Sequence, residues 1–399
     1  LMIERFRGRA LSKIMLASSL VINLGMLAVF KYSGFIVENI NSIFALSLYK
    51  PEFSLPIGIS FYTFQTLSYT IDLYRGKVKV QTSMLRFLTY VSMFPQLVAG
   101  PVVRYGDIAT ELRKRSVTAE NMALGSRKFV CGLCKKVLIA NNAGAAVEAA
   151  FGGVHMTALS AWTGIIFFTF QIYFDFSGYS DMAIGLGRML GFHYKENFEH
   201  PYISRNITEF WRRWHISLSR FFRDCVYIPL GGNRKRHILN LLIVWFLTGL
   251  WHGASWNFVL WGLYYGVILI TEKKLIGGIL QKIPFPFCHI YTMFIVIMGW
   301  TLFYFTDLSA FCECVKAMFS FGVNSYDLTS VSVFKSNIWL LVLCVLASQP
   351  WAKMFYNHFS KSSRVLSAII EPAVIAAAFA VCVAALVGGS YNPFLYFRF

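Results

Sequence analysis

Charged side chains are scarce in this sequence. Only 14% of its 399 residues are Asp, Glu, Lys or Arg, while 56% are hydrophobic. A soluble domain carries roughly 25% charged residues, which solvate its surface. The shortage excludes an ordinary soluble protein. It predicts an all-α polytopic membrane protein, because helices satisfy their own backbone hydrogen bonds inside lipid.

Acidic residues are scarcer than basic ones, at 19 against 37, which gives a formal net charge of +18. The basic residues cluster in loops between apolar runs, as the positive-inside rule describes for cytoplasmic loops. We therefore expect membrane lipid, and not nucleic acid, to be the partner of these charges.

Motifs of soluble enzymes are also missing. The sequence has no G-x-S-x-G, no Walker-type phosphate loop and no zinc-protease helix. Cys131-x-x-Cys134 has no second pair at zinc-site spacing, so we interpret these thiols as small packed hydrophobes and expect no metal. No linker divides the chain, which predicts a single transmembrane domain over residues 1–399.

Apolar runs indicate where the chain crosses the bilayer, which takes about 20 residues. We expect helices at 14–30, 53–73, 129–151, 159–176, 287–306, 335–349 and 365–388. Segment 35–49 contains Glu38, Asn39 and Asn41, which favours an interfacial position or one facing the protein interior. Basic residues between 104 and 136 predict a cytoplasmic loop.

Two elements are expected to be broken. Within 85–103, Pro95, Gly100 and Pro101 exclude a straight helix. Unwound backbone at membrane depth is tolerated where it lines a cavity or is buried in protein, so we expect a broken or re-entrant element there. The alternative is a short helix that ends in an ordinary interfacial loop.

The second broken element covers residues 238–272. As one helix it would extend about 52 Å, too long for a single pass, and basic residues flank it on both sides. A hairpin of two short helices joined near residues 252–255 explains both observations. It places His252 at the bend.

His252 is the first candidate for chemistry. Trp251 and Gly253 flank it, and Trp256 and Asn257 follow. A ring shielded from water stays uncharged and can act as a base. Acyl transfer needs such a base to take the proton of a hydroxyl that attacks a thioester. The alternative is a buried histidine bonded to a carbonyl.

We expect Gly253 to leave space for a substrate beside the His252 ring. The residues expected to line the surrounding cavity are Trp251, Gly253, Trp256, Asn257, Pro95, Gly100, Pro101 and Asp175. Asp175 and Asp181 are expected to pair internally with an arginine or a helix-end amide. Gly185 and Gly187 form a small-residue face that favours close helix packing.

The segment from Trp211 to Arg223 mixes aromatic and basic residues, as an amphipathic helix at the membrane surface does. Guanidinium groups match phosphate oxygens. The candidates to bind a phosphate-bearing donor are Arg212, Arg213, Arg220 and Arg223; the alternative is anchoring to anionic lipid. His215 in this segment is expected either to assist catalysis or to tie the helix to the core.

The chain ends in an aromatic tail, residues 392–399, which we expect to be docked. We hypothesise that Tyr396 enters the cavity opposite the donor and accepts the acyl group transiently as a phenyl ester. Interfacial anchoring of the aromatic side chains is the alternative.

Long stretches of the chain resemble one family. They are WRRWHISLSRFFRD (211–224), LTGLWHGASWNFVLWG (247–262), FPQLVAGPVVRY (94–105), FDFSGYSDMAIGLGRMLGF (174–192) and NPFLYFRF (392–399). Together they resemble the membrane-bound O-acyltransferases, in the bacterial branch that acetylates alginate and peptidoglycan. The resemblance spans roughly residues 20–399 and implies a helical bundle around a central funnel. It also implies that further N-terminal helices precede residue 1.

The resemblance implies that His252 is catalytic and that His215 matters for activity. It implies transfer of an acyl group, expected to be acetyl, from acetyl-CoA or an acyl-carrier phosphopantetheine, with no permanently bound cofactor. The acceptor side would be an extracytoplasmic polysaccharide, reached through a separate SGNH-type partner. The implied location is the bacterial cytoplasmic (inner) membrane.

Three alternatives stay open. One is delivery of D-alanine to teichoic acid by a carrier protein. Another is acylation of a lipid or a secreted protein. The third is a proton-coupled transporter in which His215 and His252 form a proton path.

Overall fold

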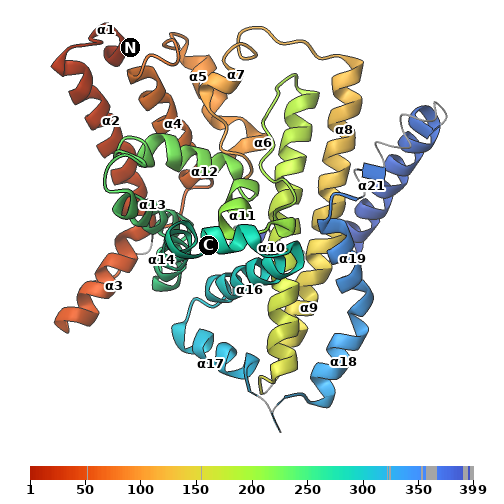
Figure 1. Ribbon diagram of the computed structural model, residues 1–399. Helices are drawn as coiled ribbons and strands as arrows, with labels where there is room; N and C mark the ends of the chain where they lie inside the picture. Colours follow the sequence, from red (N-terminus) through yellow and green to blue (C-terminus); the bar gives the residue numbers. More distant parts are fainter. Residues whose placement is uncertain are drawn as a thin grey trace.

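The structure is a computed structural model. It describes residues 1–51, 53–153, 155–320, 322, 325–351, 354–355, 366–389 and 394–395. In these residues every regular element is a helix and there is no strand, which confirms the expected all-α class (Figure 1).

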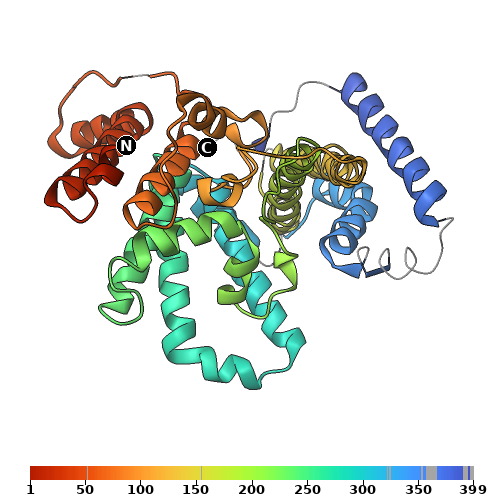
Figure 2. The same cartoon turned by 90° about the horizontal axis from the view of Figure 1, so that it is seen from above.

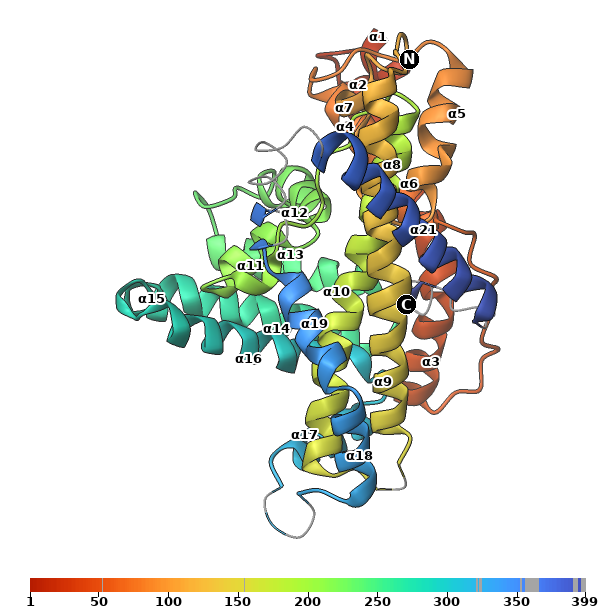
Figure 3. The same ribbon diagram turned by 90° about the vertical axis from the view of Figure 1, so that its right-hand side faces the viewer.

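A pair of long helices runs through the molecule. One consists of α8 (Ala119–Cys134), the π-helical turn η2 (Lys135–Ala140) and α9 (Asn141–Phe151); the other is α10 (Ala158–Met189). Figures 1 and 3 show them side by side. A Cβ at Gly185 would lie 2.6 Å from the Gly125 carbonyl oxygen, so the two backbones touch there. Gly187 instead lies against the Tyr194 ring.

The expected loop over 104–136 is wrong in its second half, because α8 already begins at Ala119. Thr118 caps this helix by accepting a hydrogen bond from the Asn121 amide. The stretch is polar enough to suggest a loop, yet a helix N-cap supplies the local start signal.

The broken element near residue 95 is confirmed. Here α5 (Met84–Ser92) ends, α6 (Phe94–Leu97) makes one short turn, and the chain is non-helical until α7 (Tyr105–Ile108). α4 (Ile59–Tyr74) starts beside it at Gly58, whose φ is +76°. A Cβ at Gly58 would lie 2.1 Å from the Leu97 carbonyl oxygen, so the close approach requires glycine.

The hairpin predicted at residues 238–272 is also confirmed. α13 (His237–His252) and α14 (Trp256–Thr271) pack closely, and a Cβ at Gly262 would lie 2.2 Å from the Trp245 carbonyl oxygen. From α14 the chain passes through η5 (Glu272–Ile276) and α15 (Gly277–Lys282) and returns in α16 (Phe285–Tyr304). Figure 2 shows this second hairpin projecting from one side of the bundle.

Several helices have the length and hydropathy of membrane spans. They are the helical stretch Ala10–Phe44, α16 and Ala368–Gly388. The helices α18 (Leu328–Ser336) and α19 (Ile338–Ser348) have that length and hydropathy only when they are taken as one span, which is bent by 48°. Ala10–Phe44 joins two segments that we expected to be separate. It contains α2 (Ala10–Leu27), a π-helical turn η1 (Ala28–Tyr32) and α3 (Ser33–Phe44).

The Gly262 contact predicts that Gly262→Ala destabilises the protein. The added methyl group would meet backbone, which cannot move aside, and overpacking of this kind costs typically about 1–3 kcal/mol. The thermal unfolding temperature of the purified protein should fall. Gly25→Ala in α2 is the control, because a Cβ there meets nothing within 4 Å. Equal unfolding temperatures for the two variants would contradict the observed packing.

Candidate active site

The first histidine, His215, lies in a tight turn between α11 (Ile207–Arg213) and α12 (Ile216–Phe222). The amphipathic helix expected over residues 211–223 is therefore wrong as one helix, because this turn divides it. Its φ is +42°, in the left-handed region that few non-glycine residues adopt. Asn197 stabilises the turn: its Oδ1 accepts hydrogen bonds from the Ser217 amide (3.1 Å) and hydroxyl (2.8 Å). It also lies 3.2 Å from His215 Nδ1.

The contact with Asn197 assigns the two nitrogens of His215. An amide oxygen can only accept, so Nδ1 carries the hydrogen and Nε2 keeps its lone pair. Within the described residues, Nε2 is buried and has no hydrogen-bond partner. A free lone pair at a buried position is suited to bind a donor group of a substrate.

The start of α11 is fixed by a carboxylate. Glu272 is buried in η5 and accepts from the amides of Ile207 (2.7 Å) and Thr208 (3.0 Å). A negative charge at a helix N-terminus is stabilising because the unpaired amides point at it. Neither Asn197 nor Glu272 was predicted, since each acts on a residue far away in the sequence.

The second histidine, His252, is the last residue of α13. Aromatic rings surround its imidazole, with centroids at 4.9 Å for Trp251, 4.9 Å for Trp261 and 5.2 Å for Phe303. The residue is 8% exposed, and in the described part of the chain Nδ1 has no hydrogen-bond partner. The ring is therefore held by packing and by its own backbone.

Both histidines border one cavity of about 260 Å³. Its lining includes His215, His252, Trp211, Arg212, Trp214, Arg223, Trp245 and Thr248. The Trp251 ring contacts both imidazoles, with its centroid 5.8 Å from that of His215 and 4.9 Å from that of His252. The walls are mostly apolar, and the two arginines are the charged groups among the lining residues. We call this space the histidine cavity.

His252 also borders a second, small cavity of about 20 Å³, together with Asp175, Phe303 and Leu395. The buried Asp175 pairs with Lys136, and its other oxygen accepts a hydrogen bond of 2.8 Å from the Leu395 amide. The described part of the aromatic tail, Phe394 and Leu395, is thus attached to α10. Tyr396 lies outside the described residues.

A polar cavity of about 410 Å³ adjoins the histidine cavity. It is lined by Pro101, Arg104, Asp107, Lys195, Glu196, Ser217, Arg220, Arg223 and Asp224, among others. Arg223 borders both cavities. Burial alone would raise the pKa of Asp224. The hydrogen bond from Arg223 (2.8 Å) and the charge of Arg104 nevertheless lower that pKa below its usual value, so the carboxylate is ionised.

Comparison with known proteins identifies the chain. Residues 57–315 match the membrane-bound O-acyltransferase family. The chain belongs to this family.

The relatives of this acyltransferase modify polysaccharides, according to their names. The probable alginate O-acetylase of Azotobacter vinelandii is 38% identical over 96% of this chain and 84% of its own length. The probable alginate O-acetylase of Pseudomonas aeruginosa is 41% identical over 85% of this chain and 67% of its own length. The peptidoglycan O-acetyltransferase of Helicobacter pylori is 34% identical over 83% of this chain and 69% of its own length. The chain is an O-acyltransferase and a multi-pass membrane protein.

Several expected positions in this acyltransferase need correction. Gly253 leaves no space beside His252, because a Cβ there would lie 2.3 Å from the Phe258 ring. Trp256 is 52% exposed, and its Nε1 donates to Asn39 instead of facing a cavity. Asn257 is fully buried against the carbonyl oxygens of α16.

The remaining candidates divide clearly. Pro101 lines the polar cavity and Asp175 the small one. The other three, Pro95, Gly100 and Trp251, are buried but line none of the three cavities, so their expected cavity positions are wrong. Arg213 is bound to Glu209 (2.9 Å) and lines none of them either. Asp181 pairs with Lys135 (2.6 Å), so its expected internal pairing involves a lysine.

Asn197→Ala should weaken both stability and activity. It leaves the buried His215 ring and the partly buried Ser217 without their acceptor, and an unsatisfied buried group costs about 1–3 kcal/mol. Thermal unfolding and acetyl-group turnover measure the two effects. Asn142→Ala is the control, since its side chain is exposed and, within the described residues, donates to the Leu138 carbonyl alone. Unfolding and turnover equal to the wild type would contradict the assigned role of Asn197.

Proposed function

We propose that this acyltransferase takes an acetyl group from a cytoplasmic thioester and passes it across the membrane for O-acetylation of an extracytoplasmic polysaccharide. The observation that carries the proposal is that His215 and His252 border one cavity, with Arg212 and Arg223 also in its lining. The names of the relatives support acetyl as the group and a polysaccharide as the final acceptor.

In the proposed reaction, His252 is the general base. Its uncharged imidazole takes the proton of the acceptor hydroxyl as the hydroxyl oxygen attacks the thioester carbonyl carbon. The new C–O bond forms, the C–S bond breaks, and the leaving thiolate receives the proton from the imidazolium. The aromatic surroundings support this role because they exclude water, which favours the uncharged ring.

We propose that His215 assists by orienting the substrate. The turn fixed by Asn197 holds the ring, and its free Nε2 can accept a hydrogen bond from a donor group of the pantetheine arm or the hydroxyl. In this proposal His215 moves no proton.

For the donor we propose acetyl-CoA or an acyl-carrier phosphopantetheine. The apolar histidine cavity suits the acetyl group and the thioester arm. Arg212 and Arg223 in its lining, and Arg220 in the adjoining polar cavity, suit phosphate oxygens. Arg213 is withdrawn from this set because it lines none of the three cavities.

On the acceptor side we propose that the aromatic tail takes part. Leu395 lines the small cavity that His252 also borders. Tyr396 follows Leu395 directly in the sequence. We propose that its phenol accepts the acetyl group as a phenyl ester, and that an SGNH-type partner completes the transfer. The bacterial inner membrane is the location that this route requires.

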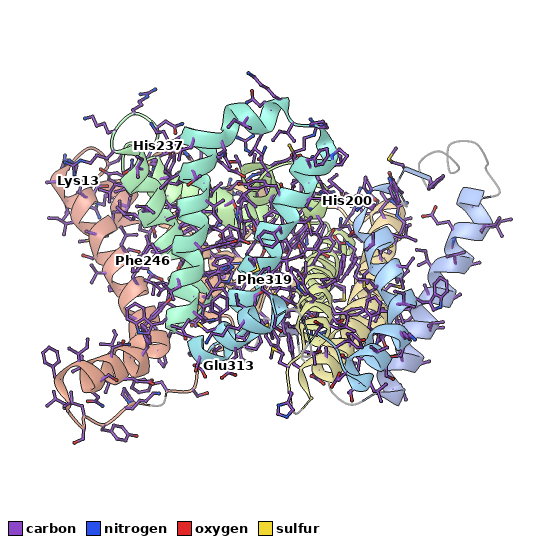
Figure 4. The ribbon with its side chains drawn as sticks, turned by 60° about the horizontal axis from the view of Figure 1, so that its bottom comes forward. Lys13, His200, His237, Phe246, Glu313 and Phe319 are labelled. Carbon is purple, nitrogen blue, oxygen red and sulfur yellow. The ribbon has the colours of Figure 1, made fainter. Side chains whose placement is uncertain are left out.

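His252→Ala should lower acetylation by at least about 100-fold, the contribution expected of a general base. The O-acetyl content of envelope polysaccharides, compared at equal protein levels, measures the effect. His237→Ala is a matched control, because His237 begins the same helix at its other end, near the surface (Figure 4). Unchanged acetylation in His252→Ala cells would contradict the proposal. Loss of D-alanyl groups in place of O-acetyl groups in His252→Ala cells would favour the teichoic acid route.

Arg223→Ala should raise the KM for acetyl-CoA about tenfold, which corresponds to the loss of about 1.4 kcal/mol of binding. The kcat should change little, since a phosphate contact binds substrate and transition state equally. Release of free CoA by the protein in nanodiscs measures both constants. Arg213→Ala, which removes a guanidinium group outside the cavities, is the control. Equal KM values for the two variants would exclude Arg223 from donor binding.

A further inference from the structure

A lysine from the N-terminal helices reaches the end of α13. Lys31 lies in the π-helical turn η1, between α2 and α3, and is partly buried. Its Nζ donates to the carbonyl oxygens of Trp251 (2.5 Å) and His252 (3.2 Å). The hydroxyl of the next residue, Tyr32, donates to the Leu250 carbonyl oxygen (2.5 Å). Two neighbouring side chains thus bind three successive carbonyls.

These carbonyls need partners from outside the helix. The last four carbonyl groups of any α-helix have no intrahelical donor. Many helices close with a left-handed turn that supplies one. Gly253 instead leaves α13 in an extended conformation, with φ −168° and ψ 160°. Lys31 and Tyr32 take the place of that turn, and a positive charge at a helix C-terminus is favourable.

Both side chains belong to the π-helical turn η1. In a regular helix, neighbouring residues point about 100° apart, whereas the extra residue of a π turn widens the spiral and re-aims the side chains. Such turns occur frequently at functional sites. Among the described residues no carboxylate forms an ion pair with Lys31, so its ammonium group is directed to the helix end alone.

A charge at membrane depth is costly and usually marks a functional site. An uncharged side chain would avoid that cost, but it would not place a positive charge at the negative end of the helix. The position of this charge is therefore informative: it is bound to the backbone of the residue that carries the proposed base.

We propose that Lys31 is a positioning residue for acyl transfer. The inference rests on the proposed role of His252 as the base. In the described part of the chain the His252 ring makes no side-chain hydrogen bond, so its orientation depends on the aromatic surroundings and on its backbone. Lys31 fixes that backbone at the last turn of α13 and so aims the imidazole into the histidine cavity.

The test compares Lys31→Met, Lys31→Gln and Lys31→Arg in full-length protein in nanodiscs, with acetyl-CoA as the probe and release of free CoA as the readout. Lys31→Met and Lys31→Gln should lower kcat at least about tenfold, because a misplaced base slows chemistry, and change the KM less than about threefold. Lys31→Arg keeps the cation and should stay within about threefold of the wild type.

Two controls separate the possible causes. Lys13→Met removes a cation from the exposed surface of α2 and should leave kcat unchanged (Figure 4). His252→Ala reports on the proposed function itself. Incorporation of labelled acetate in cells provides a second readout for any variant that purifies poorly.

The outcomes are distinct. If His252→Ala is inactive while Lys31→Met and Lys31→Gln match the wild type, the positioning role is wrong and the proposed function stands. If His252→Ala keeps full activity, the proposed function is wrong. A merely structural role for Lys31 would lower unfolding temperature and active fraction but leave kcat per folded molecule unchanged; that result would also overturn the inference.

Discussion

The end of α13 is the constraint on which the site depends. A helix stops there inside the protein, at His252, and the chain must turn back into α14 without a regular closing turn. The unpaired carbonyls of that end require donors, and Lys31 and Tyr32 provide them from the N-terminal helices. The hairpin, the N-terminal helices and the cavity therefore form one interdependent unit.

Two aspartates of α10 also have their charges paired inside the protein. The turn η2 directs two neighbouring lysines to α10, so that Lys135 meets Asp181 and Lys136 meets Asp175. An unpaired charge at such a depth would cost several kcal/mol. Asp175 in addition binds the Leu395 amide, so this pair also holds Leu395 beside the cavity that His252 borders.

Local patterns predicted much of this architecture. Length and basic flanks were enough for the hairpin at residues 238–272, and Pro95 and Pro101 were enough for the broken element, because both limits are set by bilayer thickness and backbone geometry. Contacts between distant segments were not predictable: Asn197 beside His215, Glu272 at α11 and Lys31 at His252 leave no trace in a local pattern. The space expected beside Gly253 is absent because Phe258, which the local pattern does not place there, fills it.

In the proposed reaction an activated acetyl group lies beside the His252 ring. The most direct test is an experimental structure of the protein bound to a non-reactive acetyl-CoA analogue in which a methylene group replaces the thioester sulfur. We expect the acetyl carbonyl to lie in the histidine cavity, within reach of the His252 imidazole, and the phosphates to lie at Arg223. An analogue bound with its acetyl group outside that cavity, and no path to His252, would contradict the proposed reaction.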